Sequence, residues 1–157
     1  MPRLLIAAFV LLGLVIPARA ADRDDLYAEI AAATGLNVSS RHRLGVVLGY
    51  VARDDIGLGL GLEQLYSTNP RTPDQSGFRT SLELRWFQEP FEFSADIGLL
   101  RRLFRDSSSQ SQASVGFTTA YLVALTPSLA AKVDFSFLFL EDPRVLFSGG
   151  VGARLLF

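Results

Sequence analysis

The sequence predicts an all-β protein, an eight-stranded antiparallel up-and-down transmembrane β-barrel. Three observations favour this fold. From residue 42 to the C-terminus, apolar residues alternate with polar or small ones at a period of two. The connections between the alternating segments are short and long in turn. The mean hydropathy is +0.28, yet beyond residue 20 no apolar run is long enough for a membrane-spanning helix.

The N-terminal segment is typical of a secretory signal peptide. Arg3 precedes an apolar run over residues 4–16, and a small-x-small cleavage site, Ala-Arg-Ala, ends at Ala20. The alternative is a retained membrane anchor, but the run is shorter than the span of about 20 residues that a membrane helix needs. The sequence therefore predicts a signal peptide over 1–20 and a barrel domain over 21–157.

Seven segments alternate clearly, and an eighth is ambiguous. The seven predicted strands are 42–51, 56–66, 77–87, 91–100, 114–125, 131–139 and 145–157. The eighth is predicted at 26–38, where the alanines also suit a short helix, because alanine favours helices over strands. Bacterial single-chain barrels have an even number of strands, so closure favours a strand here.

The bulky apolar side chains are predicted to face lipid, and the small or charged ones to face the lumen. A soluble β-barrel is the alternative, and it would bury the bulky stripe and expose the polar one. Here the bulky stripes are rich in leucine and phenylalanine, while the opposite stripes carry glycines and charges of both signs. A charge at Leu60 should therefore be costly, whereas a serine at Gly59 should cost far less.

This pattern resembles that of the small eight-stranded outer-membrane β-barrels of Gram-negative bacteria, the OmpA-transmembrane-domain and OmpX-like proteins. The most specific match is the C-terminal signal that such proteins present to the barrel-assembly machinery, for which Phe157, Leu155 and Gly152 fill the required places. Gly150 departs from the polar residue that opens the family's signal. The resemblance implies an integral, monomeric protein of the cell outer membrane that meets periplasmic chaperones and the assembly machinery during biogenesis.

The predicted lumen carries a nearly balanced set of charges. Since a barrel of eight strands is just wide enough to be filled by side chains, these charges must be paired. Counting from the turn at 88–90 predicts that Arg85 lies directly opposite Glu92. At the seam between the first and last strands, Arg154 and Glu29 are predicted to meet. The lumen is then a polar plug, and the alternative is a narrow ion-conducting pore.

Composition excludes several classes of function. The chain has no cysteine and a single histidine, His42, so we expect no metal site and no cofactor. A formal net charge of −1 argues against nucleic-acid binding. Ser40 and His42 form the one candidate catalytic pair, for a hydrolase that modifies lipid A. A relay also needs an acid to orient the histidine. None is predicted nearby, and Tyr66 is predicted to lie opposite His42, so we expect no enzyme.

The two ends of the barrel differ in predicted charge. Short connections at 52–55, 88–90 and 126–128 are typical of periplasmic turns, and the long ones at 67–77 and 101–112 are typical of the outer side. The outer connections are basic and the periplasmic ones acidic. Arginine suits phosphate, so the basic outer residues are candidates for contact with lipopolysaccharide: Arg41, Arg43, Arg101, Arg102 and Arg105. We therefore expect a structural, surface-interaction or lipopolysaccharide-contacting role.

Overall fold

The structure, a computed structural model, describes residues 26–36, 41–52, 55–68, 74–88, 90–104, 106–141 and 145–157. The predicted signal peptide, Ser40 and Arg105 lie outside these residues. The eight strands are β1 (Leu26–Gly35), β2 (Arg41–Val51), β3 (Ile56–Ser67), β4 (Asp74–Gln88), β5 (Phe91–Phe104), β6 (Ser109–Thr126), β7 (Leu129–Leu140) and β8 (Val145–Leu156).

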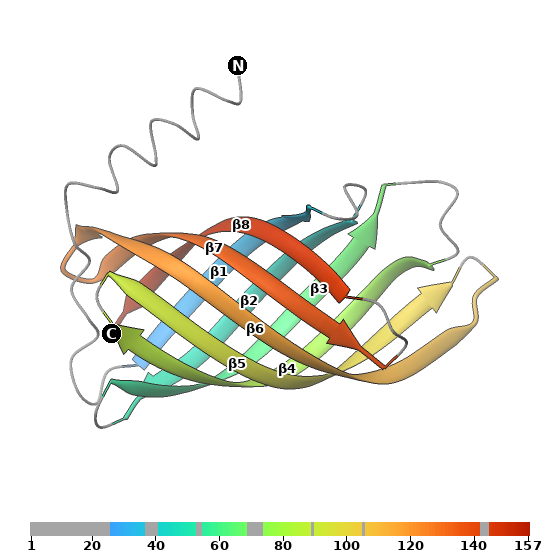
Figure 1. The fold of residues 1–157 in the computed structure, drawn as a ribbon, viewed down its shortest axis with the longest axis horizontal. Coiled ribbons are helices and arrows are strands. Elements are labelled where there is room, and N and C mark those ends of the chain that lie inside the picture. Colours follow the sequence, from blue (N-terminus) through green and yellow to red (C-terminus); the bar gives the residue numbers. More distant parts are fainter. Residues whose placement is uncertain are drawn as a thin grey trace, which may run out of the picture.

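The strands form one closed barrel in sequence order, and each pairs antiparallel with its neighbours (Figure 1). Closure comes from β8, which pairs with β1 from Tyr27↔Leu156 to Gly35↔Ser148. This confirms the predicted fold class. It also settles the ambiguous first segment as a strand, because pairing on both sides outweighs the helical preference of its alanines. We call the end with Leu26 and Phe157 the periplasmic end and the opposite one the outer end.

The predicted orientation of the two faces is confirmed. Large apolar side chains cover the outside, with Leu60 66% exposed and Ile97 63% exposed. Charged side chains fill the inside, with Arg79 and Arg85 each 2% exposed. A soluble barrel would show the reverse, so that alternative is wrong. Val123, predicted to face lipid, is an exception because it is buried. Among the described residues there is no helix long and apolar enough to cross a membrane.

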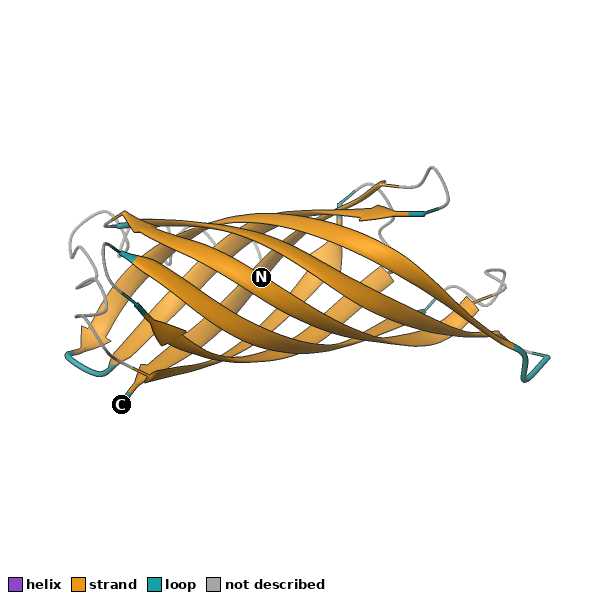
Figure 2. Ribbon diagram, turned by 90° about the horizontal axis from the view of Figure 1, so that it is seen from below, coloured by secondary structure: helices purple, strands orange, loops and turns teal. Residues whose placement is uncertain are grey.

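The prediction that residues 101–112 form a long outer connection is wrong. Most of it is strand, because β5 continues to Phe104 and β6 begins at Ser109. Among the described parts of the outer end, the resulting hairpin projects furthest (Figure 2). The segment is rich in serine and glutamine rather than in the β-branched and aromatic residues that favour strands, so the sequence predicts a loop there. Cross-strand pairing with β5 makes it a strand.

The predicted alignment of β4 with β5 is also wrong, by two residues. Arg85 lies opposite Ser94, and Glu92 lies opposite Phe87. The register differs because β4 extends one residue further than predicted, to Gln88, which pairs with Phe91, the predicted first residue of β5. A shift of two residues keeps every side chain on its predicted face, so the lumen set is unchanged.

An apolar layer closes the lumen at the periplasmic end. It consists of Tyr27, Val47, Val51 and Phe87, all buried, with Leu156 packed against it. The glycines of β2 and β3 make room for the Tyr27 ring. A Cβ atom on Gly59 would lie 2.8 Å from the Tyr27 hydroxyl. A serine at Gly59 would therefore have to displace the tyrosine, so we expect it to cost more than lumen parity alone suggests, and its cost relative to a charge at Leu60 stays a prediction.

The C-terminal residues complete the seam between β8 and β1. The Phe157 N–H donates to the Leu26 carbonyl at 2.9 Å, and the ring is 69% exposed. Gly152 lies against β1, where an added Cβ atom would come within 2.5 Å of the Ile30 carbonyl oxygen. Close strand approach thus explains the glycine independently of assembly. The role of Gly152, Leu155 and Phe157 as an assembly signal stays a prediction.

Candidate functional site

Three groups of polar side chains occupy the interior, one above another. The lower cluster lies in the periplasmic half and consists of Glu29, Glu83, Arg85, Glu92, Lys132 and Arg154. The upper cluster consists of Arg43, Glu63, Arg79, Asp96 and Asp134. The mouth pocket, at the outer end, is lined by Arg41, Leu65, Tyr66, Ser67, Ser76, Gly77, Leu100 and Arg102.

The lower cluster is centred on Glu29. This carboxylate accepts from Arg85 at 2.7 Å and from Arg154 at 2.8 Å, and it also pairs with Lys132. Register explains one of these contacts, because Glu29 and Arg154 are direct cross-strand neighbours on β1 and β8. Three cations from three other strands therefore converge on one acid.

Arg85 and Glu92 meet despite the corrected register. Arg85 Nη1 lies 3.0 Å from Glu92 Oε1, which is a diagonal contact rather than a direct one. Diagonal neighbours in a sheet lie within reach of long side chains. Arg85 also pairs with Glu83 at 2.6 Å, and Arg154 pairs with Glu92. The lower cluster holds equal numbers of acids and bases, so its formal charge is zero.

The aromatic rings of the apolar layer contact the lower cluster from below. The Arg85 guanidinium lies 5.1 Å from the centre of the Tyr27 ring. That of Arg154 lies 5.3 Å from the same ring and 5.2 Å from the Phe87 ring. Such cation–π contacts are worth most when they are desolvated. The sequence analysis missed this layer, although the inward parity of Tyr27 was a signal for it.

The upper cluster is centred on Arg79 and is less completely bonded. Arg79 pairs with Glu63 at 3.1 Å and with Asp96. Arg43 lies 3.3 Å from Glu63 but 3.9 Å from Asp134 Oδ1, and that oxygen accepts no hydrogen bond. Three acids face two bases. We infer no metal site from this imbalance, since the described residues contain no group of three metal-ligating side chains.

The candidate catalytic histidine lies on the outer half of the lipid-facing surface. As predicted, His42 is opposite Tyr66, and the ring centres are 5.2 Å apart. Its Nδ1 is 3.2 Å from the Thr34 hydroxyl and its Nε2 is 3.4 Å from that of Thr68. Both ring nitrogens thus face hydroxyls rather than a carboxylate. Ser40 lies outside the described residues, so its distance from His42 is not defined.

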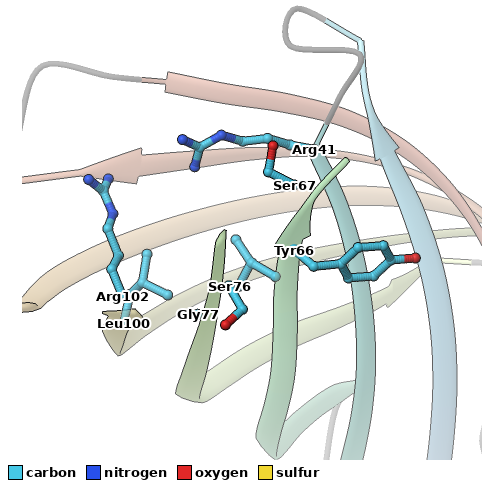
Figure 3. A pocket seen from close by; sticks show the side chains of 8 residues that line it. Arg41, Tyr66, Ser67, Ser76, Gly77, Leu100 and Arg102 are labelled. Carbon is cyan, nitrogen blue, oxygen red and sulfur yellow. The ribbon is translucent and has the colours of Figure 1, made fainter. Parts of the chain in front are cut away.

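The mouth pocket brings two arginines together at the outer end. Arg41 from β2 and Arg102 from β5 both extend across it, and Ser67 lies beside Arg41 (Figure 3). Tyr66 points away from the pocket, toward the outside of the barrel (Figure 3). Arg102 is 5% exposed and faces inward. The pocket therefore offers guanidinium and hydroxyl donors at the entrance of a lumen that is filled below.

The described members of the predicted basic outer set, all but Arg105, do not form a single surface. Arg101 and Arg102 lie in β5, not in a loop, and they point to opposite faces: Arg101 is exposed and Arg102 is buried. Arg43 points into the lumen and belongs to the upper cluster. Arg41 and Arg102 both line the mouth pocket, and Arg41 and Arg43 line a second hollow beside it. Strand parity decides the directions of Arg101 and Arg102, and the sequence analysis missed it there because it treated 101–112 as a loop.

Comparison with known proteins finds likeness in structure and none in sequence. No protein-family model matches the chain, and no curated protein matches it. Among solved structures, neisserial surface protein A matches with a TM-score of 0.60 and 17% identity, over 85% of this chain and 95% of that one. This chain has the fold of a small outer-membrane β-barrel.

Two further structures show the same fold. The N-terminal β-barrel domain of Pseudomonas aeruginosa OprF matches with a TM-score of 0.57 and 18% identity, over 86% of this chain and 98% of that one. Ail, the attachment invasion locus protein of Yersinia pestis, in complex with the heparin analogue sucrose octasulfate, matches with a TM-score of 0.56 and 12% identity, over 86% and 99%. The expected resemblance to small outer-membrane barrels is confirmed at the level of fold.

Proposed function

We propose that this protein is a non-enzymatic outer-membrane barrel whose mouth pocket binds phosphate groups of lipopolysaccharide. The observation that carries the proposal is the convergence of Arg41 and Arg102, from two different strands, on a pocket that also presents Ser67 and Ser76. Guanidinium groups bind phosphate through paired charge-assisted hydrogen bonds, and hydroxyls add further donors. The outer leaflet of Gram-negative bacteria presents lipid A and core phosphates at this level.

Two features of the molecule support an anionic ligand. The described residues that line the mouth pocket include two arginines and no carboxylate. In addition, a protein of the same fold, Ail, has been solved with a polysulfated heparin analogue. Sulfate and phosphate share tetrahedral geometry and negative charge, so a surface polyanion is the class of ligand that the pocket suits.

The two alternative functions have less support. A narrow pore requires an open lumen, but here Arg85, Glu92 and Glu29 are each at most 4% exposed and lie bonded across it. A lipid A hydrolase requires a base oriented by an acid, and His42 contacts hydroxyls instead. The lower cluster therefore functions as a structural plug in this proposal, and His42 as a residue of the membrane interface.

The experiment is a binding titration of the refolded protein in phospholipid bilayers. Lipopolysaccharide, the same lipopolysaccharide after dephosphorylation, and inorganic phosphate are the three ligands. Arg41→Gln should weaken binding of the intact lipopolysaccharide about tenfold, as expected for one charge-assisted contact. Arg101→Gln is the matched control, because Arg101 is at the same end but outside the pocket, and it should bind normally.

The three ligands separate the sources of the phosphate. Preference for intact over dephosphorylated lipopolysaccharide supports the proposal. Tight binding of inorganic phosphate alone, with no preference between the two lipopolysaccharides, identifies a site for free anions instead. Equal binding by the unaltered protein and Arg41→Gln excludes the mouth pocket.

A further inference from the structure

A hollow lies on the lipid-facing surface, over the seam where β8 pairs with β1. We call it the seam hollow, and its volume is about 520 Å³. Sites for small ligands usually measure about 300–1,000 Å³, so the seam hollow can hold part of a lipid. Its lining includes Ala32 and Thr34 of β1, His42 and Leu44 of β2, Phe135 of β7 and Gly149 of β8.

Small residues leave the floor of the seam hollow open. Thr34 lies directly opposite Gly149, and Ala32 lies two residues nearer the periplasmic end on the same face. An added Cβ atom at Gly149 would lie 3.5 Å from its nearest neighbours, which is an ordinary van der Waals distance. At Gly150 and Gly152 it would come within 2.8 and 2.5 Å of backbone carbonyl oxygens. Packing of the barrel therefore explains the other two glycines but not Gly149.

The walls of the seam hollow are apolar. On the β7 side, the Phe135 ring is stacked with that of Phe147, and the ring centres are 6.4 Å apart. The Phe137 ring is stacked with Phe147 as well, at 4.6 Å. On the β2 side, Leu44 is 45% exposed. Within a bilayer these walls offer van der Waals contact, which a hydrocarbon chain can make along its length.

The outer end of the seam hollow is polar. Thr34 and His42 are cross-strand neighbours, and the Thr34 hydroxyl lies 3.2 Å from His42 Nδ1. The Tyr66 ring lies beside the His42 ring and points toward the outside of the barrel (Figure 3). Hydroxyl and imidazole groups both donate and accept hydrogen bonds. The hollow is thus polar at the outer end and apolar toward the middle of the membrane, which is the polarity of a lipid in the outer leaflet.

The polar end of the seam hollow adjoins the mouth pocket. Arg41 and His42 are consecutive residues of β2, so their side chains point to opposite faces of the strand. Arg41 lines the mouth pocket and His42 lines the seam hollow, while Tyr66 lines both. A lipid with one chain in the hollow therefore has its head group beside a guanidinium, whose charge is complementary to that of a phosphate.

We propose that the seam hollow binds one acyl chain of lipopolysaccharide, with Thr34 and His42 hydrogen-bonded to polar groups at the head of the chain. The identity of the lipid rests on the proposed function, because the same molecule presents its phosphate to the mouth pocket. Acyl chains of lipid A carry hydroxyl and amide groups next to the sugar, and these are partners for a threonine hydroxyl and an imidazole. The barrel then holds one lipopolysaccharide at a fixed place on its circumference.

The first measurement locates the chain. The mature barrel is refolded in bilayers that contain lipopolysaccharide with a photoreactive diazirine on its acyl chains, and mass spectrometry maps the labelled peptides. Labelling should be concentrated on β1, β7 and β8 beside the seam hollow. Phosphatidylethanolamine with the same diazirine should label all faces about evenly. Even labelling by both lipids would indicate an ordinary lipid annulus and overturn the proposal, as would a second barrel crosslinked at the hollow.

Matched variants test the seam hollow. Ala32→Leu fills its floor, whereas Ala113→Leu adds the same side chain to another lipid-facing hollow, of about 510 Å³, whose described lining contains no histidine or tyrosine. Both leucines face lipid, so both variants should fold. Ala32→Leu should weaken binding of lipopolysaccharide about tenfold and disperse the labelling, and Ala113→Leu should change neither. Thr34→Val keeps the shape, removes the hydroxyl and should weaken binding about threefold.

A second set of ligands separates this inference from the proposed function. Lipopolysaccharide without its ester-linked chains keeps the phosphates, and dephosphorylated lipopolysaccharide keeps the chains. Ala32→Leu should lose the preference for the fully acylated form and keep that for phosphate, and Arg41→Gln should do the reverse. An acylation preference that Ala32→Leu leaves intact excludes the seam hollow. Loss of the acylation preference in Ala32→Leu supports the hollow even if no phosphate preference exists, in which case only the proposed function fails.

Discussion

The lower cluster and the mouth pocket use the same residue type, arginine, in opposite ways. In the lower cluster, Arg85 and Arg154 are buried, and each pairs with more than one carboxylate. In the mouth pocket, Arg41 and Arg102 lie beside serine hydroxyls, and none of the described residues that line it is a carboxylate. The difference teaches that the surrounding side chains, not the residue type, distinguish an arginine buried in the ionic network from one at the entrance of the lumen.

The upper cluster lies between these extremes. Arg79 is bonded to Glu63, Asp96 and Ser114, yet Asp134 keeps an oxygen without a hydrogen bond. Bonding is thus less complete in the upper cluster than in the lower one. This difference is what we expect if the lower cluster contributes more to the stability of the barrel.

Deletion of Phe157 should remove most of the protein from the outer membrane. The residue closes the seam through its N–H bond to Leu26 and ends the predicted assembly signal. Membrane fractions of cells that express the deletion should contain little barrel, with the protein degraded or left in the periplasm. Phe157→Tyr, which keeps an aromatic end, should assemble normally. Normal yield of the deletion would contradict the predicted signal.

Glu29→Gln should destabilise the barrel by about 3–5 kcal/mol, because it leaves three buried cations around a neutral amide. The matched variant Glu63→Gln, in the upper cluster, should cost less, since its partner Arg79 keeps Asp96. Urea unfolding of both variants in lipid vesicles measures the difference. Equal losses would show that the upper and lower clusters are not distinct in stability.

Leu60→Arg should destabilise by about 2–4 kcal/mol if residue 60 lies near the bilayer midplane. Gly45→Ser is the lumen control. Its Cβ atom would lie 3.2 Å from the Glu63 side chain and 3.7 Å from the Leu62 carbonyl oxygen, so only the Glu63 side chain has to move by a small amount. Gly59→Ser should cost more than Gly45→Ser, because it displaces Tyr27. The same unfolding assay ranks all three.

Arg41→Gln should change the unfolding free energy by less than about 1 kcal/mol, as is usual for partly exposed charges. The same variant is expected to weaken binding of lipopolysaccharide. The two variants should therefore differ: Glu29→Gln lowers the stability of the barrel, whereas Arg41→Gln lowers its affinity for lipopolysaccharide. A large loss of stability in Arg41→Gln would place the mouth pocket with the structural clusters.

Ser40→Ala and His42→Ala should leave the lipid A of the producing cell unchanged. His42 contacts Thr34 and Thr68 rather than an acid, so it has no orienting partner for base catalysis among the described residues. Mass spectrometry of lipid A from cells with and without each variant provides the measurement. An acyl chain lost only when His42 is present would establish the hydrolase.

The sequence by itself determined most of the strand pattern, the direction of the two faces and the lumen charges of both clusters except Arg43. Each of these features depends on which face of the strand a residue occupies. Faces alternate with a period of two, so a misplaced strand end does not change the face of any residue within the strand. The shift of two residues between β4 and β5 illustrates this, since Arg85 and Glu92 still face inward. The sequence also determined that Glu29 and Arg154 lie near the same seam, because the first and last strands of the barrel carry them.

Only the tertiary structure decided which charges meet and where the lipid-facing surface is hollow. Arg85 reaches Glu29 from β4 to β1, across the lumen, and no local pattern encodes that distance. The strand status of 101–104 and 109–112 likewise depends on their pairing with each other rather than on the serines and glutamines of the segment. The seam hollow exists because Thr34 of β1 lies opposite Gly149 of β8, and the two become neighbours only when the barrel closes.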